Sequence, residues 1–377
     1  MIGRDVILAA EWKWHLVIKT PALVFIALFV AILLSSILLL SAKGNGHPER
    51  WALPPKRGEI SQAASLGETL WILRANGKLS QVGPGQDKIR TVELSPPVLG
   101  ICRDGDVLWS LAGDRAGAGT WTLRRLSGAK WIEHAQIRPA GEPFVALTCR
   151  AGAATALTPY SFVVVAGSDS KRIALSQPLR HANSVVVFED GRGIHVGLNS
   201  GEFGGGLIRI DGSTGALSEI ESHEVGIVCG GLLNPECDPV TGITADPERP
   251  DCVLASVGLA HLRLHGRIIR VCGDRVQKYY TRASRAPEPQ LGLSDSEPYE
   301  SAAFFGVTSS SGGVMAAGLD GLYNLSREGV ARRSPWPTLK DVDGVRFSYQ
   351  VPGVVVVMTG INRAVSLGGS TPLLISR

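Results

Sequence analysis

Cysteines are the residues of this 377-residue sequence that point most directly to chemistry. Four of the six lie in a stretch rich in Pro, Gly and Asp, and these are Cys229, Cys237, Cys252 and Cys272. Four thiolates can bind zinc, but structural zinc sites usually contain close Cys-x-x-Cys pairs, which this sequence lacks. We therefore expect disulfides that hold a long loop, with the pairs Cys229–Cys237 and Cys252–Cys272.

The other two cysteines, Cys102 and Cys149, are expected to form a disulfide between neighbouring repeats of the chain. The sequence alone leaves other pairings of the six cysteines open. All six follow an apolar N-terminal run, and none precedes it. An even number of cysteines on one side of a membrane indicates disulfides in an oxidising compartment.

A glycine-rich run at residues 201–206 is the second unusual feature of the sequence. Glycines let the backbone turn sharply or approach a ligand closely. Within this run Glu202 is expected to be an exposed carboxylate that can bind a cation or a sugar hydroxyl near the axis of the fold. Asn199 and Arg209 are the candidate ligand-binding residues on either side of it. A plain β-turn is the alternative explanation of the run, and its glycine spacing is not that of a dinucleotide-binding fingerprint.

Histidines supply further candidate site residues. His195 lies in a predicted strand, and Asp238 lies in the cysteine-rich stretch. His261 and His265 share one face of another predicted strand with Arg263 between them, because side chains alternate along a strand, and these three can line a polar channel. The alternative for each histidine is a solvated or hydrogen-bonded structural role. No motif indicates a metal ion or a cofactor, since Walker A, His-Glu-x-x-His and Gly-x-Ser-x-Gly sequences are all missing.

A recurring pattern of a turn glycine followed by an apolar strand organises the chain that carries these residues. The intervals between the starts average about 48 residues, and the starts lie near residues 67, 105, 152, 193, 252, 313 and 353. A period of 40–50 residues built from short strands is typical of propeller blades. The sequence therefore predicts an all-β fold, a β-propeller of about seven four-stranded blades, with six or eight blades as alternatives.

The segment from Ala317 to Tyr323 carries a resemblance to known repeats. Its strand–Gly–Leu pattern resembles the repeats of WD40-like and two-component-regulator-type bacterial β-propellers. The residues around Asn199–Leu207 and Cys229–Cys272 look like those of an uncharacterised membrane-anchored propeller family. This resemblance implies the propeller fold, and it implies no particular activity.

An apolar run without any charge between Lys19 and Lys43 predicts one transmembrane α-helix before the propeller. The expected organisation is a short cytoplasmic tail at residues 1–20, the helix at 21–42, a linker at 43–60 and the propeller at 61–377. A cysteine-rich loop insertion is expected near residues 225–275. A cleaved signal peptide is the alternative for the helix, but its apolar core is normally shorter than this run.

Charges next to the span do not decide its orientation, because Lys and Arg occur on both sides of it. The cysteines decide it instead, and we expect a bacterial inner-membrane protein with its large C-terminal domain in the periplasm. The formal net charge of +4 is small for this length and shows no basic excess that would indicate a nucleic-acid partner.

Two classes of function fit these features. The first is a binding, scaffolding or sensor module for a protein or glycan partner in the cell envelope, anchored to the membrane by one helix. The second is an envelope enzyme, a glycan hydrolase or lyase, with its site in the axial cleft of the propeller and clustered carboxylates and histidines. Convergence of the candidate side chains in one pocket would favour the enzyme.

Overall fold

The computed structural model divides the chain into two units, residues 1–51 and 52–377. The structure describes residues 60–83, 90–180, 184–223, 229–261, 263–283, 301–310, 312–327, 329–335, 345–351, 354–359, 364–366 and 373–376. The predicted tail, transmembrane helix and nearly all of the linker lie outside these residues. Within the described part, none of the helices has the length and apolar character needed to cross a bilayer.

Six four-stranded sheets are antiparallel meanders in which strands pair in chain order. The first three contain β1 (Ile60–Leu66), β2 (Thr69–Arg74), β3 (Leu79–Val82) and β4 (Arg90–Val92); β5 (Val98–Asp104), β6 (Val107–Ala112), β7 (Trp121–Ser127) and β8 (Lys130–Ile137); and β9 (Ala146–Arg150), β10 (Ala153–Leu157), β11 (Ser161–Ala166) and β12 (Asp169–Ala174). The next three contain β13 (Ser184–Glu189), β14 (Gly193–Asn199), β15 (Gly205–Asp211) and β16 (Leu217–Ile220); β17 (Val240–Ala245), β18 (Val253–His261), β19 (Arg263–Cys272) and β20 (Arg275–Tyr280); and β21 (Phe304–Ser310), β22 (Gly313–Gly318), β23 (Gly321–Ser326) and β24 (Ala331–Ser334).

A seventh four-stranded sheet has a different strand order. It consists of β25 (Val345–Val351), β26 (Val354–Thr359), β27 (Ala364–Ser366) and β28 (Leu373–Ser376). The order is β25-β26-β28-β27, and β26 pairs with β28 in parallel. The expectation of about seven regular blades is therefore supported for six blades only, because the last sheet is not an up-and-down meander.

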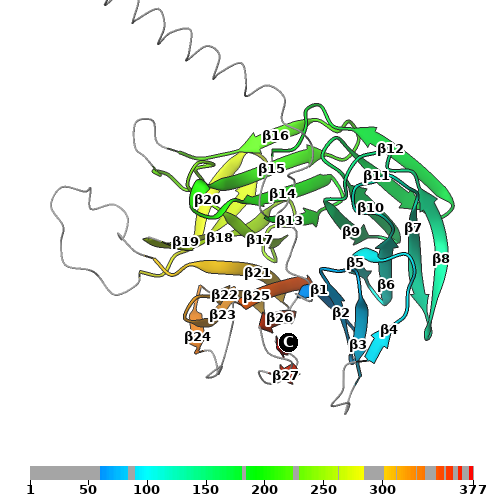
Figure 1. The fold of residues 1–377 in the computed structure, drawn as a ribbon. Coiled ribbons are helices and arrows are strands. Elements are labelled where there is room, and N and C mark those ends of the chain that lie inside the picture. Colours follow the sequence, from blue (N-terminus) through cyan, green and yellow to red (C-terminus); the bar gives the residue numbers. More distant parts are fainter. Residues whose placement is uncertain are drawn as a thin grey trace, which may run out of the picture. The chain divides into compact units, whose positions relative to one another are not determined.

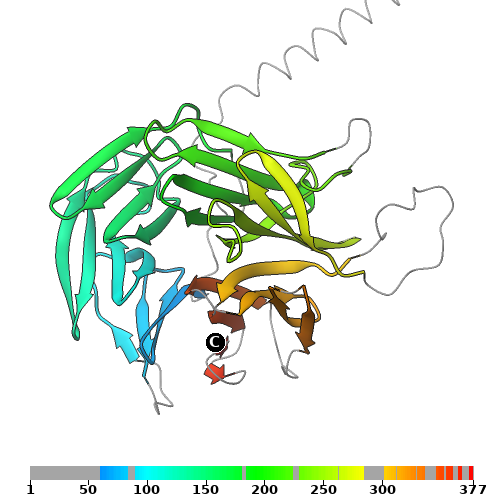
Figure 2. The same ribbon diagram turned by 180° about the vertical axis from the view of Figure 1, so that it is seen from behind.

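The first strands of successive sheets contact one another around a common axis, as Figures 1 and 2 show. These contacts run from β1 to β5, β9, β13, β17, β21 and β25, and β25 in turn contacts β1. The sheets therefore radiate from a central ring of first strands, which is the arrangement of a β-propeller. The predicted fold class is confirmed at this level.

Turn glycines and buried apolar strands explain why these sequences form sheets. Gly67 and Gly105 have φ near +55°, and each lies in the turn between the first two strands of its sheet. Glycine adopts this conformation without steric cost. The second strand of a sheet is covered on both faces by its neighbours, so β22 is buried along its whole length. Trp121 is fully buried between the second and third sheets, with its ring 5.8 Å from that of Phe144.

Hydrogen bonds join neighbouring sheets close to these first turns, and we call this set the inter-sheet belt. A side chain takes part in each bond, and the boundaries bridged are those between sheets one to six. The belt consists of Arg103 Nη1 to Ser65 O (3.0 Å), Gly152 N to Asp104 Oδ2 (2.5 Å), Thr148 Oγ1 to Glu189 Oε2 (2.6 Å), Arg192 Nη2 to Asp251 O (2.6 Å) and Thr244 Oγ1 to Ser309 Oγ (3.3 Å).

The three predicted cysteine pairs are those found in the structure. Cys102–Cys149 links β5 to β9 and so joins two neighbouring sheets, as expected. Cys252–Cys272 joins the start of β18 to the end of β19 within the fifth sheet. Cys229–Cys237 closes a small ring in the connection between β16 and β17. Much of the stretch near 225–275 is therefore regular sheet, and the loop within it is the segment between β16 and β17.

Candidate functional site

His195 forms a buried pair with Asp190 near the first turn of the fourth sheet. Its Nε2 lies 3.2 Å from Asp190 Oδ2, and its Nδ1 is buried without a hydrogen-bond partner. Burial alone would raise the pKa of Asp190, but hydrogen bonds from His195 and from the backbone N–H groups of Arg192 and Gly193 outweigh it and hold that pKa well below its usual range. Arg209 lies opposite His195 in the register of β14 and β15. The Asp190–His195 pair therefore stabilises the turn between β13 and β14.

Asp238 and His265 contact each other at the other end of the sheets, together with an arginine that sequence reasoning missed. His265 Nε2 lies 2.7 Å from Asp238 Oδ1, and Arg267 Nη2 donates to Asp238 Oδ2 at 2.6 Å. Arg267 also donates to the carbonyl oxygens of Gly231 and Leu232. Because these carbonyls belong to the loop closed by Cys229–Cys237, the cluster fastens that loop to the fifth sheet.

The glycine-rich run packs against this same loop. The N–H of Gly205 donates to Pro235 O at 2.8 Å, and the N–H of Gly206 donates to Asp238 O at 2.9 Å. A Cβ on Gly204 would lie 2.3 Å from Pro235 O, so no larger residue fits there. The close backbone approach that the glycines allow is therefore to another loop of the chain.

The tip of this run projects from the fold. Asn199 Oδ1 accepts a hydrogen bond from the N–H of Gly201 at 2.9 Å, which fixes the start of the short 3₁₀ helix η3 (Gly201–Phe203). Glu202 is exposed at the surface, as predicted. Beside it, Phe203 is 78% exposed, the highest value among the large hydrophobic side chains of the described residues.

His261 and Arg263 pair in register at the tip of the β18–β19 hairpin. Their side chains lie outside the described residues, so the predicted polar channel with His265 stays a prediction. The other candidates lie at different places in the fold: His195 pairs with Asp190 near the first turn of the fourth sheet, Asp238 pairs with His265 at the opposite end of the sheets, and Glu202 is exposed on η3. In the part of the chain that the structure describes, no three His, Cys, Asp or Glu side chains gather into a possible metal site.

Three exposed apolar side chains occupy equivalent positions in three different sheets, and we call them the apolar rim. Tyr160, Phe203 and Leu319 are 41%, 78% and 46% exposed, and each lies in the connection between the second and third strands of its sheet. In an up-and-down meander this connection lies at the end opposite the first turn. The rim, the glycine-rich run and the Cys229–Cys237 loop therefore share the end of the propeller away from the inter-sheet belt.

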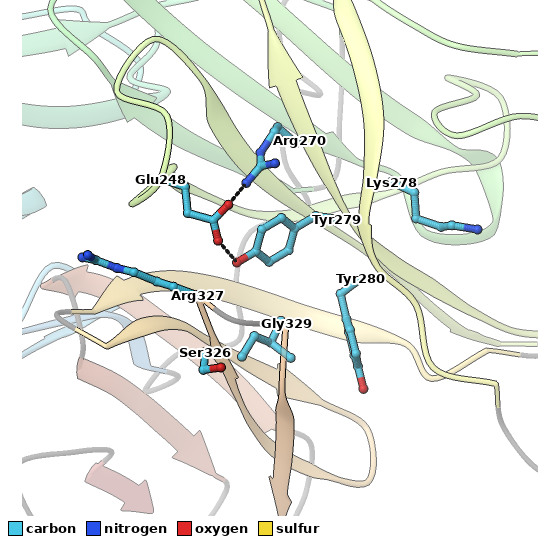
Figure 3. A pocket seen from close by; sticks show the side chains of 9 residues that line it. Glu248, Arg270, Lys278, Tyr279, Tyr280, Ser326, Arg327 and Gly329 are labelled. Atoms are coloured by element: carbon cyan, nitrogen blue, oxygen red, sulfur yellow. Dashed lines mark hydrogen bonds and ion pairs between the residues drawn. The ribbon is translucent and has the colours of Figure 1, made fainter.

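A small pocket lies between the fifth and sixth sheets (Figure 3). Its volume is about 230 Å³, and we call it the edge pocket. Its walls include Tyr279 and Tyr280 of β20, Arg270 of β19 and Glu248 of the β17–β18 connection. Arg327, in the β23–β24 connection, lies on the opposite wall.

Charged groups around Tyr279 are already paired with one another. Arg270 forms ion pairs with the buried Asp246 and with Glu248, the second at 2.5 Å. Its guanidinium carbon lies 5.0 Å from the ring centre of Tyr279. Burial, together with the charges of Glu248 and Asp246, raises the pKa of Tyr279 to about 12. The phenol is therefore a neutral hydrogen-bond donor in the physiological range.

Two sequence signals could have found the residues that were missed. Arg267 continues the alternation of His261, Arg263 and His265, and extending the period-two pattern by one step includes it. Tyr279–Tyr280 is an adjacent aromatic pair. Its partners Arg270 and Glu248 come from β19 and from the β17–β18 connection, and no spacing in the sequence predicts that they lie beside it.

The fold defines this chain as a β-propeller, and comparison with known proteins adds no closer identity. No protein-family model matches the sequence, and no curated protein matches it. YCF48 bound to D1 peptide is similar in structure, with 11% identity over 74% of this chain and 82% of that chain and a TM-score of 0.48. The β-propeller domain of the Trilobed protease from Pyrococcus furiosus is 8% identical over 80% and 90% of the two chains, with a TM-score of 0.45. The extracellular domain of the putative hybrid two-component system BT4673 from B. thetaiotaomicron is 12% identical over 76% of this chain and 34% of that chain, with a TM-score of 0.41.

Proposed function

We propose that this chain is a membrane-anchored, extracytoplasmic β-propeller that binds a protein partner in the bacterial cell envelope. The observation that carries the proposal is the position of Phe203 on a loop held by the rest of the fold. Its backbone is held by the hydrogen bond from the Gly201 N–H to Asn199 Oδ1 and by glycine hydrogen bonds to the Cys229–Cys237 loop. A rigid, exposed aromatic side chain loses little conformational entropy on binding, and such side chains are enriched among the anchors of protein interfaces.

The arrangement of the loops also indicates that the binding face is the end of the propeller that carries the apolar rim. Tyr160 and Leu319 add apolar surface at equivalent positions. At the opposite end several connections are tight glycine turns, such as those at Gly67 and Gly105, which offer little surface for recognition. A partner contacting the apolar rim would span several sheets and would remove Phe203 from water.

Site-specific photocrosslinking in intact cells tests the binding face. A photoreactive amino acid replaces Phe203, and the matched control replaces Asp106, a highly exposed residue in the first turn of the second sheet. We expect a discrete crosslinked protein from position 203 and none from position 106. The same crosslinked protein from both positions, or none from position 203, would contradict the proposal.

Thiol labelling tests the anchor and the compartment. The three disulfides and the charge-free run between Lys19 and Lys43 support a domain outside the cytoplasm on a membrane tether. We expect the protein to fractionate with membranes and its six cysteines to resist maleimide until a reductant is added. Six reactive cysteines in the folded protein would place the domain in the cytoplasm.

A further inference from the structure

The edge pocket is shaped by an irregularity in β20. Tyr280 pairs with Ile268 and Lys278 pairs with Ile269, so Tyr279 is an extra residue between two consecutive pairs. An extra residue of this kind is a β-bulge, and bulges change the direction of a side chain. Adjacent strand residues normally point to opposite faces, but here Tyr279 and Tyr280 both pack against the cluster shared with the sixth sheet. The bulge therefore places two tyrosines on the wall of one pocket.

Tyr279 presents one face of its ring to the pocket. The guanidinium of Arg270 covers the other face, and Arg270 is itself held by Asp246 and Glu248. Figure 3 shows the ring between Arg270 on one side and the connection around Ser326 and Gly329 on the other. The Tyr279 ring is thus held by Arg270 on one face and forms part of the pocket wall.

Polar groups lie at one end of this surface. Glu248 Oε1 is 3.5 Å from the Tyr279 hydroxyl, at the outer limit of a hydrogen bond, so the carboxylate retains capacity to accept further bonds. Arg327 lies at the same end in Figure 3, and its side chain is exposed. An acceptor group and a donor group therefore lie toward the same edge of the aromatic ring (Figure 3).

Size and charge define the ligand class. The volume of about 230 Å³ is below that of pockets enclosing drug-sized ligands, so it suits a single ring. Arg270 is neutralised by Asp246 and Glu248, and Lys278 and Arg327 also line the pocket, so its charges come close to balance and do not require a charged ligand. A neutral sugar ring has an apolar C–H face for Tyr279 and an edge of hydroxyls for Glu248 and Arg327.

We propose that the edge pocket binds one neutral sugar ring of a glycan, with the ring on Tyr279 and its hydroxyls bonded to Glu248 and Arg327. This site is separate from the apolar rim, because its walls include the β17–β18 and β23–β24 connections, which lie at the opposite end of the sheets. The propeller then carries a protein-binding face at one end and a saccharide subsite near the other.

Saturation-transfer NMR on the full chain, in a detergent without a sugar headgroup, tests the proposal. The probes are glucose, galactose, mannose and N-acetylglucosamine, with glucuronate as the charged comparison. We expect at least one neutral sugar to bind with a Kd in the millimolar range and more tightly than glucuronate. No binding by any neutral sugar, or tighter binding of glucuronate, would overturn the proposal.

Three variants assign that binding to the pocket. Tyr279→Ala should weaken the sugar affinity at least tenfold, and Arg327→Ala, which changes an exposed side chain, about threefold. Ile132→Ala, at an exposed apolar residue of β8 in the second sheet, should leave the sugar affinity unchanged. If Tyr279→Ala does not fold, Arg327→Ala still decides, and wild-type affinity in that variant would overturn the assignment. Because crosslinking from Phe203 concerns the opposite end, failure of either proposal leaves the other measurable.

Discussion

Arg267 donates a hydrogen bond to Asp238 at 2.6 Å while both side chains are almost completely excluded from solvent, with relative exposures of 2% and 0%. The same guanidinium binds two carbonyl oxygens of the Cys229–Cys237 loop. A buried ion pair of this kind contributes little net stability, but removing one partner leaves the other charge buried and unpaired. The pair therefore links the position of the Cys229–Cys237 loop to the Asp238 carboxylate, because Arg267 bonds to both.

We expect Asp238→Ala to lower the free energy of unfolding by about 3–5 kcal/mol, because Arg267 would remain buried without its counter-charge. Urea denaturation of the full chain measures the change. Adding Arg267→Met to the same variant should recover a large part of the loss, since the unpaired charge is then removed. A loss below about 1 kcal/mol for Asp238→Ala would show that the pair is solvated in solution.

Gly205→Ala should destabilise the protein more than Gly201→Ala. A Cβ at Gly205 would lie 2.0 Å from Leu198 O. A Cβ at Gly201 would have no atom within 4 Å, so the only obstacle there is the φ of +65°. At Gly201 the left-handed conformation costs a non-glycine residue about 1–2 kcal/mol. At Gly205 the clash is with backbone, which must move, and overpacking of this kind costs about 1–3 kcal/mol and occasionally more. Crosslinking efficiency from Phe203 should fall with Gly205→Ala only. Equal unfolding free energies for the two variants would contradict the tight packing.

Loss of the Cys102–Cys149 disulfide should cost more stability than loss of Cys229–Cys237. The first closes a loop with a sequence separation of 47 residues and the second a loop with a separation of 8. The chain-entropy relation gives about 4 and about 2.5 kcal/mol respectively. Double Cys→Ala variants compared by urea denaturation check this order. The reverse order would mean that these disulfides do not stabilise the protein mainly by reducing the entropy of the unfolded chain.

Tyr279 should make stability fall at alkaline pH. Burial and nearby carboxylates raise its pKa in the folded protein to about 12, above the value of about 10 in an unfolded chain. The unfolded state therefore releases its proton first, and the contribution is complete below pH 10 and lost as the pH rises toward 12. The free energy of unfolding of the wild type should decline more steeply than that of Tyr279→Phe between pH 9.5 and 11, with Tyr160→Phe as the control. Parallel curves would contradict this.

Asp190 should make the stability of the protein fall at acid pH. Its hydrogen bonds hold the folded-state pKa well below the value of about 4 expected in an unfolded chain. The stability that it contributes is complete above pH 4 and is lost as the pH falls toward the lowered pKa. The stability advantage of the wild type over Asp190→Asn should therefore shrink between pH 4.5 and 2.5. An advantage that stays constant over this range would show that Asp190 titrates normally.

The turn pattern of the sequence was enough to predict an all-β propeller and the positions of several of its sheets, although only six of about seven predicted blades are regular. The predicted starts at Gly67 and Gly105 lie in the connection between the first two strands of a sheet, and the start near residue 193 is the first residue of β14. The cysteine pairs could also be predicted, because Cys102 and Cys149 occupy similar places in consecutive repeats. The predicted start near residue 353 lies outside the described residues, and the different strand order of the last sheet had no counterpart in the repeat pattern.

Long-range contacts of single side chains could not be predicted in this way. The glycines at 204–206 indicated that the backbone approaches another group closely, but only the structure shows that this group is the backbone at Pro235. Glu248, Arg270 and Tyr279 are brought together by pairing between strands and by a bulge, and neither is encoded in a local period. Among the predicted candidates, Asp238 and His265 touch each other, with 2.7 Å between Asp238 Oδ1 and His265 Nε2.

The inter-sheet belt also bears on which changes of sequence the propeller can accept. Its bonds, such as Arg103 to Ser65 and Thr148 to Glu189, join adjacent sheets near their first turns. The longer connections lie at the other end of the sheets, for example the β16–β17 connection that carries Cys229 and Cys237. Insertions into these connections would leave the belt bonds in place. That end of the propeller can therefore diverge in sequence and in partner while the spacing of the sheets is kept.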